Sequence, residues 1–292
     1  MKSNWTPTVL LTYRRSVNEI EQIALRAARA AGRIHLHWLN RTTTTRKSNA
    51  LDLVTEADKE AEATIIETIH RAFPTHAVLA EESGASEQKS DHRWIVDPLD
   101  GTTNFAHGFP AFCVSIAYEH RGRVQLAVIF DALHKELFTA RRGKGAKLNG
   151  KPIGVSKTKA LTTSLLATGL AYDHRERRRF YLCFWEQMMT RVEGVRLAGS
   201  AALDLAYLAC GRLDGLWEFG LKPWDIAAGS LLVEEAGGTV TNMDGSTLDI
   251  AGAQTLATNS RIHQEMAQLL REIRPEADRR HLEPLCNEGT AP

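Results

Sequence analysis

The stretch WIVDPLDGTTNF, residues 94–105, decides how the rest of this sequence is interpreted. A run of β-forming residues, Trp94–Val96, ends on Asp97, and the proline that follows forces the chain to bend. Asp100 comes three residues after Asp97, and the glycine after it permits backbone geometry that other residues avoid. We therefore predict a strand that ends in a tight turn carrying two carboxylates.

The oxygen atoms of this turn suit a metal ion. Asp97, Asp100 and the Leu99 carbonyl between them can converge on one point, and hard divalent cations prefer such oxygen ligands. The sequence through Gly101 and Thr102 can begin a helix whose N–H groups face an anion. An isolated DxxD is also typical of an acidic capped turn on a surface, but the complete DPLDGTTNF string is far more specific.

Two further acidic positions stand at the ends of predicted elements. Glu81-Glu82 comes directly after the apolar run Ala77–Ala80, and Asp225, in KPWDIAAG, stands at a predicted helix start. Taken singly, each has a plainer interpretation, a solvated strand end for the pair and a helix N-cap for the aspartate. Together with the two aspartates of the turn, they indicate a split site for more than one metal ion.

The overall charge and composition exclude several classes of protein. The 36 Lys and Arg residues nearly balance the 35 Asp and Glu residues, which argues against bulk nucleic-acid binding. A chain that is 43% hydrophobic and 24% charged is not a disordered one. The four cysteines form no CxxC pair, which favours a reducing compartment. Because we find no membrane span and no secretory signal, we expect a soluble, cytoplasmic protein.

Helical spacing dominates the first part of the chain. Ser16 and Glu19 form a capping box that predicts a helix through Ile34. The polar stretch 41–50 is interpreted as a loop, and Thr55-x-x-Asp58 predicts a second helix start, with an end at Pro74. Short apolar runs then predict strands at 77–80, 94–96, 114–118, 124–130 and 136–140, the last three as an antiparallel meander.

Strands and helices alternate in the second half. We predict strands at 164–168, up to 197 and at 216–219, and helices at 176–189, 201–209, 225–236 and 262–273. The pattern indicates a layered α/β or α+β fold. We divide it into an N-terminal half, residues 1–150, a C-terminal half of the same compact unit, residues 151–273, and a flexible tail, residues 274–292.

Three other patterns carry less weight. His35 and His37 lie two residues apart on the first predicted helix, so they face different sides and are not expected to share a metal ion. RRGKGAK, residues 141–147, lacks the spacing of a phosphate-binding loop and is interpreted as a basic hairpin. The basic run 174–179 is interpreted as a solvated helix face or, alternatively, as a partner surface.

Several motifs in the same order give the sequence a resemblance to a known family. They are DLVTEAD (52–58), AEESG (80–84), WIVDPLDGTTNF (94–105), LAGSAALDLAYLACGRLDG (197–215) and KPWDIAAGSLLVEEAGG (222–238). From Val17 to Ile273 the chain resembles the inositol monophosphatases, which are magnesium-dependent and lithium-sensitive phosphatases, and it is most similar to their bacterial branch. The resemblance implies an αβαβα sandwich of the sugar-phosphatase type and a homodimer.

The same resemblance implies roles for individual residues. The metal ligands would be Glu81, Asp97, Leu99 through its carbonyl, Asp100 and Asp225, for about two or three Mg2+ ions. The residues that align the water nucleophile would be Glu81, Thr102 and Asp58. The substrate contacts would be Asp100, Gly101, Thr102, Gly199, Ser200, Ala201 and Glu218. Lys47 would lie on a loop near the metals, and taken alone it is equally typical of an exposed loop lysine.

The activity that follows from the resemblance is hydrolysis of inositol-1-phosphate by direct in-line attack of a metal-activated water. Within the superfamily, fructose-1,6-bisphosphate, a nucleotide 3′-phosphate or histidinol phosphate stay open as alternative substrates. Similar bacterial proteins also act in transcription, so an antitermination role through a transcription-machinery partner is a second class of hypothesis. We expect no membrane contact and no direct binding of nucleic acid.

Overall fold

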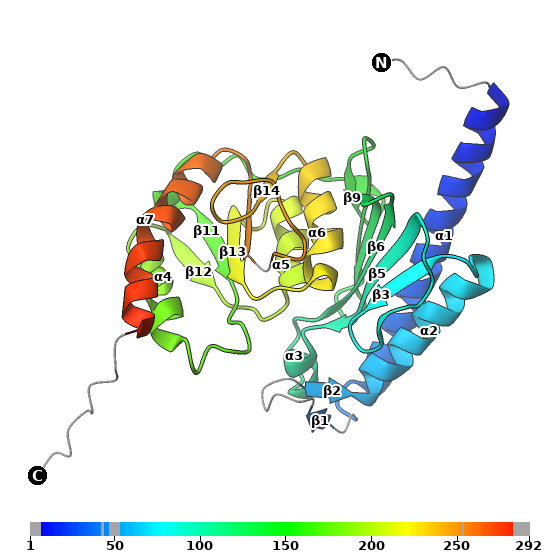
Figure 1. Ribbon diagram of the computed structural model, residues 1–292, viewed down its shortest axis with the longest axis horizontal. Helices are drawn as coiled ribbons and strands as arrows, with labels where there is room; N and C mark the ends of the chain where they lie inside the picture. The colour runs from blue at the N-terminus through cyan, green and yellow to red at the C-terminus, as the bar shows by residue number, and fades with distance from the viewer. Residues whose placement is uncertain (1–6, 42–43, 47–52, 253, 283–292) are drawn as a thin grey trace, which may run out of the picture.

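The computed structural model describes residues 7–41, 44–46, 53–252 and 254–282, and these form five stacked layers (Figure 1). Helices α1 (Pro7–Trp38) and α2 (Glu56–Ala72) pack on one face of a first sheet. Helices α5 (Ala201–Ala209) and α6 (Pro223–Glu235) lie between that sheet and a second one. Helices α4 (Arg178–Met189) and α7 (His263–Leu282) cover the far side. This order confirms the predicted αβαβα fold.

The first sheet is mixed and has eight strands, in the order β10-β9-β8-β7-β6-β5-β3-β4. Its strands are β3 (Ala77–Ala80), β4 (Gly84–Ala85), β5 (His92–Asp100), β6 (Cys113–His120), β7 (Arg123–Asp131), β8 (Glu136–Arg141), β9 (Ala146–Leu148) and β10 (Lys151–Pro152). Strands β3 and β5 are parallel, and β6, β7 and β8 form the predicted antiparallel meander. Parallel β3 and β5 bring their carboxyl ends, with Glu81 and Asp97, to the same edge.

The second sheet has five strands, in the order β12-β11-β13-β15-β14. Its strands are β11 (Leu165–Thr168), β12 (Gly194–Arg196), β13 (Gly215–Phe219), β14 (Thr239–Thr241) and β15 (Gln254–Thr258). The smaller elements are β1 (Thr44–Arg46) paired with β2 (Leu53–Thr55), the short helix α3 (Thr102–Ala106) and the 3-10 turn Leu161–Thr163. The division of the chain near residue 150 stays a prediction.

The two helices between the sheets are buried on nearly every side. Nearly every residue of α5 is buried, and so is the run Ile226–Val233 of α6, because each helix contacts a sheet on both sides. Among the α1 residues whose side chains the structure describes, the buried ones form a stripe that runs from Ile20 to His35. None of the described helices combines the length and the apolarity that a membrane span requires.

Three predictions about element ends are wrong. Helix α1 begins at Pro7, so Ser16 lies inside the helix and does not cap it. The stretch 41–50, predicted as a loop, contains strand β1, which pairs with β2. Residues 283–292 of the predicted flexible tail lie outside the described residues, but helix α7 continues past Arg274 to Leu282, so residues 274–282 of that tail are helical. There Ala277 is buried, and Arg280 forms ion pairs with Glu276 and with Glu186 of α4, so tertiary contacts hold the last turns.

Candidate active site

A cavity of about 310 Å3 lies where β3, β5, β13 and the starts of α3, α5 and α6 meet. Ten of the residues assigned from the sequence line it, namely Glu81, Asp97, Leu99, Asp100, Gly101, Thr102, Gly199, Ala201, Glu218 and Asp225. Two others lie behind its wall, since Asp58 is fully buried and Ser200 is 2% exposed. Lys47 lies outside the described residues.

The turn at the end of β5 explains why two aspartates reach this cavity. Asp97 pairs with Ser115 of β6 and Asp100 pairs with Cys113, so the two residues between them bulge out of the ladder. The Leu99 N–H donates to Asp97 Oδ1 at 2.9 Å, which closes the bulge. Gly101 has φ +90°, and a Cβ there would lie 2.7 Å from the Ala111 carbonyl oxygen, so this position requires glycine.

Burial and mutual repulsion dominate the electrostatics of the cavity. Burial, together with the charges of Glu81, Asp100 and Asp225, raises the pKa of Asp97 well above its usual range. Burial and the charge of Asp100 likewise raise the pKa of Asp225. At neutral pH the folded chain can therefore hold these carboxylates close together only if protons or cations neutralise part of their charge.

Asp225 has a structural partner as well as a place in the cavity. It is the third residue of α6, and its Oδ2 accepts the Lys222 N–H at 2.7 Å, which caps the helix. Its Oδ1 and the Oδ2 of Asp97 accept no hydrogen bond from the residues that the structure describes. Each of these carboxylates therefore keeps one oxygen for a ligand.

Thr102 and Asp58 form a hydrogen-bonded pair at the cavity wall. The Thr102 hydroxyl has one proton, and two acceptors lie within its reach, Asp58 Oδ1 at 2.9 Å and the Leu99 carbonyl oxygen at 3.0 Å. The other carboxylate oxygen of Asp58 accepts the N–H and the hydroxyl of Thr55, at 2.7 and 2.6 Å, and the first of these bonds belongs to a capping box at the predicted start of α2. Asp58 thereby connects the start of α2 to the start of α3.

Asp100 is held by the start of α5. Its Oδ2 accepts the Ser200 hydroxyl at 2.6 Å and the Ala202 N–H at 2.8 Å. These bonds oppose the effect of burial, which still raises the pKa of Asp100 above its usual range. Ser200, assigned from the sequence as a substrate contact, therefore acts on the cavity through Asp100.

Glu218 reaches the cavity because its neighbour across the sheet has no side chain. A Cβ on Gly169 would lie 1.8 Å from Glu218 Oε1, so only glycine leaves room for this carboxylate. Burial, with repulsion from Asp204, Asp225 and Asp100, raises the pKa of Glu218 well above its usual range. Asp204 is itself buried, and burial next to the charge of Asp100 raises its pKa to about 8.

Two residues that fix the site were not assigned from the sequence. Asn104 Nδ2 donates to the carbonyl oxygens of Ala111 and Ala198, both at 2.7 Å, and so ties α3 to the loop before α5. His35 Nε2 lies 2.8 Å from the carbonyl oxygen of Pro98, in the turn after β5. The signal for His35 was available, because it lies four residues after Ala31 on the buried stripe of α1.

The donor set fits a hard divalent cation better than a soft one. Within the described part of the chain, the lining of the cavity offers carboxylates and the Leu99 carbonyl, and it includes no histidine and no cysteine. Among the described residues, no three His, Cys, Asp or Glu side chains form a ready-made metal cluster. Glu81, Asp97, Asp100 and Asp225 therefore line the cavity without converging fully.

Comparison with known proteins identifies relatives along almost the whole chain. The model of the Inositol monophosphatase family matches residues 16–275. An inositol-1-monophosphatase of Synechocystis is 47% identical over 85% of this chain and 88% of its own length. A Nus factor SuhB of Pseudomonas aeruginosa is 44% identical over 90% of this chain and 96% of its own length. The solved inositol monophosphatase of Anabaena has a TM-score of 0.80 at 46% identity, and covers 88% of this chain and 97% of its own.

Proposed function

The chain belongs to the inositol monophosphatase family, a family of phosphatases, and from this premise we propose that it hydrolyses inositol-1-phosphate in a Mg2+-dependent reaction. One observation carries the proposal. Buried Asp97, with Glu81, Asp100 and Asp225 on the same cavity, forms a set of carboxylates whose charges repel one another. Such a set is costly in an inert protein and useful in one that binds cations and a phosphate dianion.

Mg2+ suits this cavity. The Leu99 carbonyl and the free oxygens of Asp97 and Asp225 are hard ligands, and Glu81 and Asp100 complete the proposed set. A related solved structure, 26% identical with a TM-score of 0.77, is an IMPase/NADP phosphatase complexed with Mg2+ and phosphate. When bound, Mg2+ would lower the pKa of a water and offset the charge on the phosphate.

Residues of the chain itself would position the attacking water and take its proton. When Thr102 donates its proton to Asp58, its hydroxyl oxygen, which lines the cavity, is left to accept a hydrogen bond from the attacking water. Asp58 is fixed by Thr55, which prevents the pair from turning away. Glu81 lines the same cavity, where it can take the proton of that water.

Substrate recognition is assigned to the opposite wall. Glu218, Gly199 and Ala201 line the cavity there, and Glu218 is buried enough to act as a selective hydrogen-bond partner for ring hydroxyls. Burial and the neighbouring carboxylates raise the pKa of Glu218, which favours its protonated form, and a protonated carboxyl donates as well as accepts hydrogen bonds. This property suits a polyol, in which every hydroxyl both donates and accepts.

A panel of phosphate esters tests the proposal. With Mg2+ present, inositol-1-phosphate should be hydrolysed with a kcat/KM above those of fructose-1,6-bisphosphate, a nucleotide 3′-phosphate and histidinol phosphate. With EDTA in excess, hydrolysis should stop, because the carboxylates alone cannot activate water. Hydrolysis that survives chelation would contradict the metal-dependent reaction, and equal turnover of all esters would contradict the assigned substrate.

A second candidate function concerns transcription. The relative from Pseudomonas aeruginosa is named a Nus factor, and at 44% identity it is nearly as similar as the inositol-1-monophosphatase. As the alternative, we propose that the chain binds a partner of the transcription machinery and that this role does not require catalysis. A catalytically inactive Asp225→Asn variant that still complements a cellular deletion would favour this role, whereas loss of complementation would favour the enzyme.

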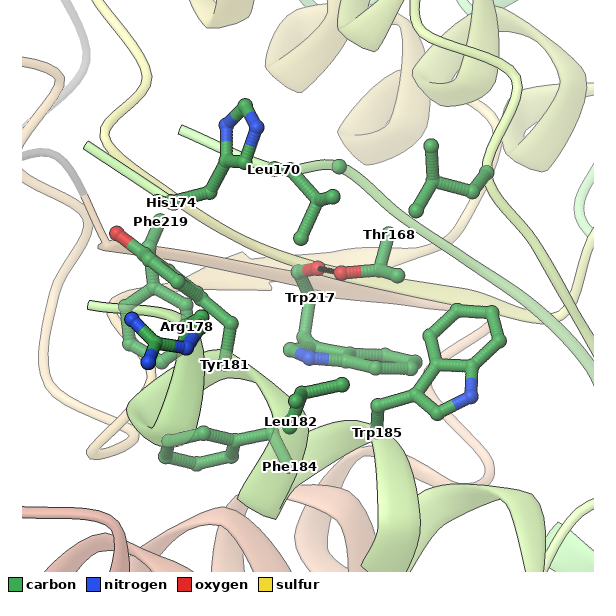
Figure 2. A pocket seen from close by; sticks show the side chains of 12 residues that line it. Thr168, Leu170, His174, Arg178, Tyr181, Leu182, Phe184, Trp185, Trp217 and Phe219 are labelled. Atoms are coloured by element: carbon green, nitrogen blue, oxygen red, sulfur yellow. Dashed lines mark hydrogen bonds between the residues drawn. The ribbon is translucent and has the colours of Figure 1, made fainter. Parts of the chain in front are cut away.

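We also propose that two copies of the chain associate through an apolar groove beside the active site. Figure 2 shows this groove, in which Leu182 and Trp185 of α4 face Leu170. Leu182 and Met189 are each 58% exposed, and with Trp185 they recur at helical spacing on one face of α4. A face of this kind marks an interaction site in a soluble protein.

Size-exclusion chromatography with light scattering tests the association. A charge at Leu182 should disrupt an apolar contact between copies, so Leu182→Glu is expected to elute as a monomer where the unmodified chain elutes as a dimer. Leu282→Glu is the matched control, because Leu282 is 81% exposed but lies at the far end of α7. A monomeric unmodified chain, or a dimeric Leu182→Glu variant, would contradict this interface.

A further inference from the structure

A buried histidine of α1 lies against the acidic turn that follows β5. The side chain of His35 is fully buried, and the centre of its ring lies 6.0 Å from the ring centres of both Phe105 and Phe112. Its Nε2 lies 2.8 Å from the Pro98 carbonyl oxygen. Because a carbonyl oxygen only accepts hydrogen bonds, Nε2 must carry the ring proton and donate it to Pro98.

The second ring nitrogen of His35, Nδ1, is buried without a hydrogen-bond partner among the residues that the structure describes. Burial lowers the pKa of His35 to about 4, so the ring is neutral at pH 7 and Nδ1 is a bare acceptor. An unpaired polar atom in the interior costs free energy that an apolar side chain of similar size would avoid. What the imidazole adds over such a side chain is the N–H that it donates to Pro98.

This hydrogen bond acts on a peptide group that the strand ladders leave free. Pro98 and Leu99 bulge out of the ladder with β6, and the ladder with β3 ends before them. The Pro98 carbonyl and the Leu99 N–H belong to one trans peptide group, so they point in opposite directions. His35 holds the carbonyl end, and Asp97 Oδ1 accepts a hydrogen bond from the N–H end at 2.9 Å.

The orientation of the Asp97 carboxylate depends on this peptide group. Because Oδ1 accepts the Leu99 N–H, Oδ2 is the oxygen that remains for a ligand in the cavity. Rotation of the peptide group would break that bond and let the carboxylate turn. His35 opposes the rotation from the far side, and hydrogen bonds in series also polarise one another, which strengthens both.

We propose that His35 is a positioning residue for the metal site, which fixes the Asp97 carboxylate through the peptide group between Pro98 and Leu99 and so raises the affinity of the cavity for Mg2+. The inference rests on the proposed Mg2+-dependent function for the identity of the cation, and on the contacts above for the way in which the histidine acts. His35 does not line the cavity, so its effect falls on metal binding and not on contact with the substrate.

Calorimetric titration with Mg2+ tests the proposal on two variants of equal side-chain length. Methionine in place of His35 cannot donate a hydrogen bond, whereas glutamine carries an N–H donor close to the position of Nε2. His35→Met should weaken Mg2+ binding about tenfold, the usual scale for loss of support behind a metal ligand, and His35→Gln should stay within about threefold of the unmodified chain. His37→Met is the matched control, because His37 is an exposed histidine of the same helix, and it should leave the affinity unchanged.

The Mg2+ dependence of hydrolysis provides a second readout. His35→Met should need about tenfold more Mg2+ for half-maximal hydrolysis of inositol-1-phosphate, and its kcat should return close to the original value at saturating Mg2+. A merely structural role for the histidine would instead lower the rate at every Mg2+ concentration, because less of the protein would be folded.

Equal Mg2+ affinities of His35→Met and the unmodified chain, or a glutamine variant as weak as the methionine variant, would overturn the inference. If His35→Met does not fold, proton–nitrogen NMR of the unmodified chain decides. A ring proton on Nε2 is the expected result, and a proton on Nδ1 alone would overturn the inference, since that ring cannot donate to Pro98. Failure of the unmodified chain to bind Mg2+ would overturn the proposed function as well, whereas equal affinities would overturn the role of His35 and leave that function intact.

Discussion

Replacement of Asp225 by asparagine is expected to lower kcat/KM for inositol-1-phosphate by about a thousandfold, because loss of one charged ligand removes several kcal/mol of metal-dependent stabilisation. Asparagine keeps the size of the side chain and an oxygen for the Lys222 N–H, so the cap of α6 can persist. The measurement is the initial rate at saturating Mg2+.

Thermal unfolding without added metal distinguishes a lost ligand from a lost fold. Because the pKa of Asp225 is raised in the folded chain, the folded chain holds this proton more tightly than the unfolded chain does. The free energy of unfolding therefore falls as the pH rises and the proton is lost. At neutral pH its charge therefore destabilises the metal-free protein, and Asp225→Asn should melt no lower than the unmodified chain. Asp91→Asn, which removes an exposed carboxylate paired with Arg121, should leave the activity unchanged. Activity of Asp225→Asn within tenfold of the original would contradict a role in metal binding.

Removal of the Thr102 hydroxyl is expected to lower kcat by about a hundredfold or more, the usual scale for a group that orients or accepts a proton in the reaction. Thr102→Ala leaves Asp58 without the bond at 2.9 Å and leaves the attacking water without an acceptor at the cavity wall. Because the Thr55 cap on Asp58 is separate, α2 should remain intact. KM should change little, since the hydroxyl acts on the water and not on the bound ester.

The conservative variant decides whether the hydroxyl or the methyl group matters. Thr102→Ser keeps the hydroxyl at the same backbone position and should restore kcat to within about tenfold of the original. Thr103→Ala is the neighbouring control, because Thr103 also lines the cavity but has no hydrogen bond to Asp58. If Thr102→Ser were as impaired as Thr102→Ala, packing of the threonine and not its hydroxyl would explain the loss.

Local chemistry made the acidic turn predictable. The proline after Asp97 cannot donate to the ladder, and only glycine readily adopts the φ of +90° found at position 101. Asp97 and Asp100 each stand directly before one of these two residues. The structure accordingly has a bulge between Asp97 and Asp100, followed directly by helix α3. The helix start at Thr55 and Asp58 was likewise predictable, because both hydrogen bonds of its capping box lie within four residues.

Long-range packing produced features that no spacing indicates. The rings of His76, His92 and His120 stack in one column, with successive centres 4.6 Å apart, and the Trp94 Nε1–H donates to His76 Nδ1 at 3.1 Å. Burial, with repulsion from His92 and His70, lowers the pKa of His76 to about 4, so its ring is a neutral acceptor at neutral pH. The column exists only because the sheet register aligns these strands.

The sequence by itself determined the family, the layered fold and the residues that carry the carboxylates, because short motifs of proline, glycine and aspartate dictate local turns wherever they occur. Only the tertiary structure decided what those residues touch. It set Thr102 against Asp58, Ser200 against Asp100 and Glu218 into the space above Gly169. The physical reason is distance along the chain. The first two pairs are separated by 44 and 100 residues, so their contacts depend on how distant elements pack and on the register of the strands.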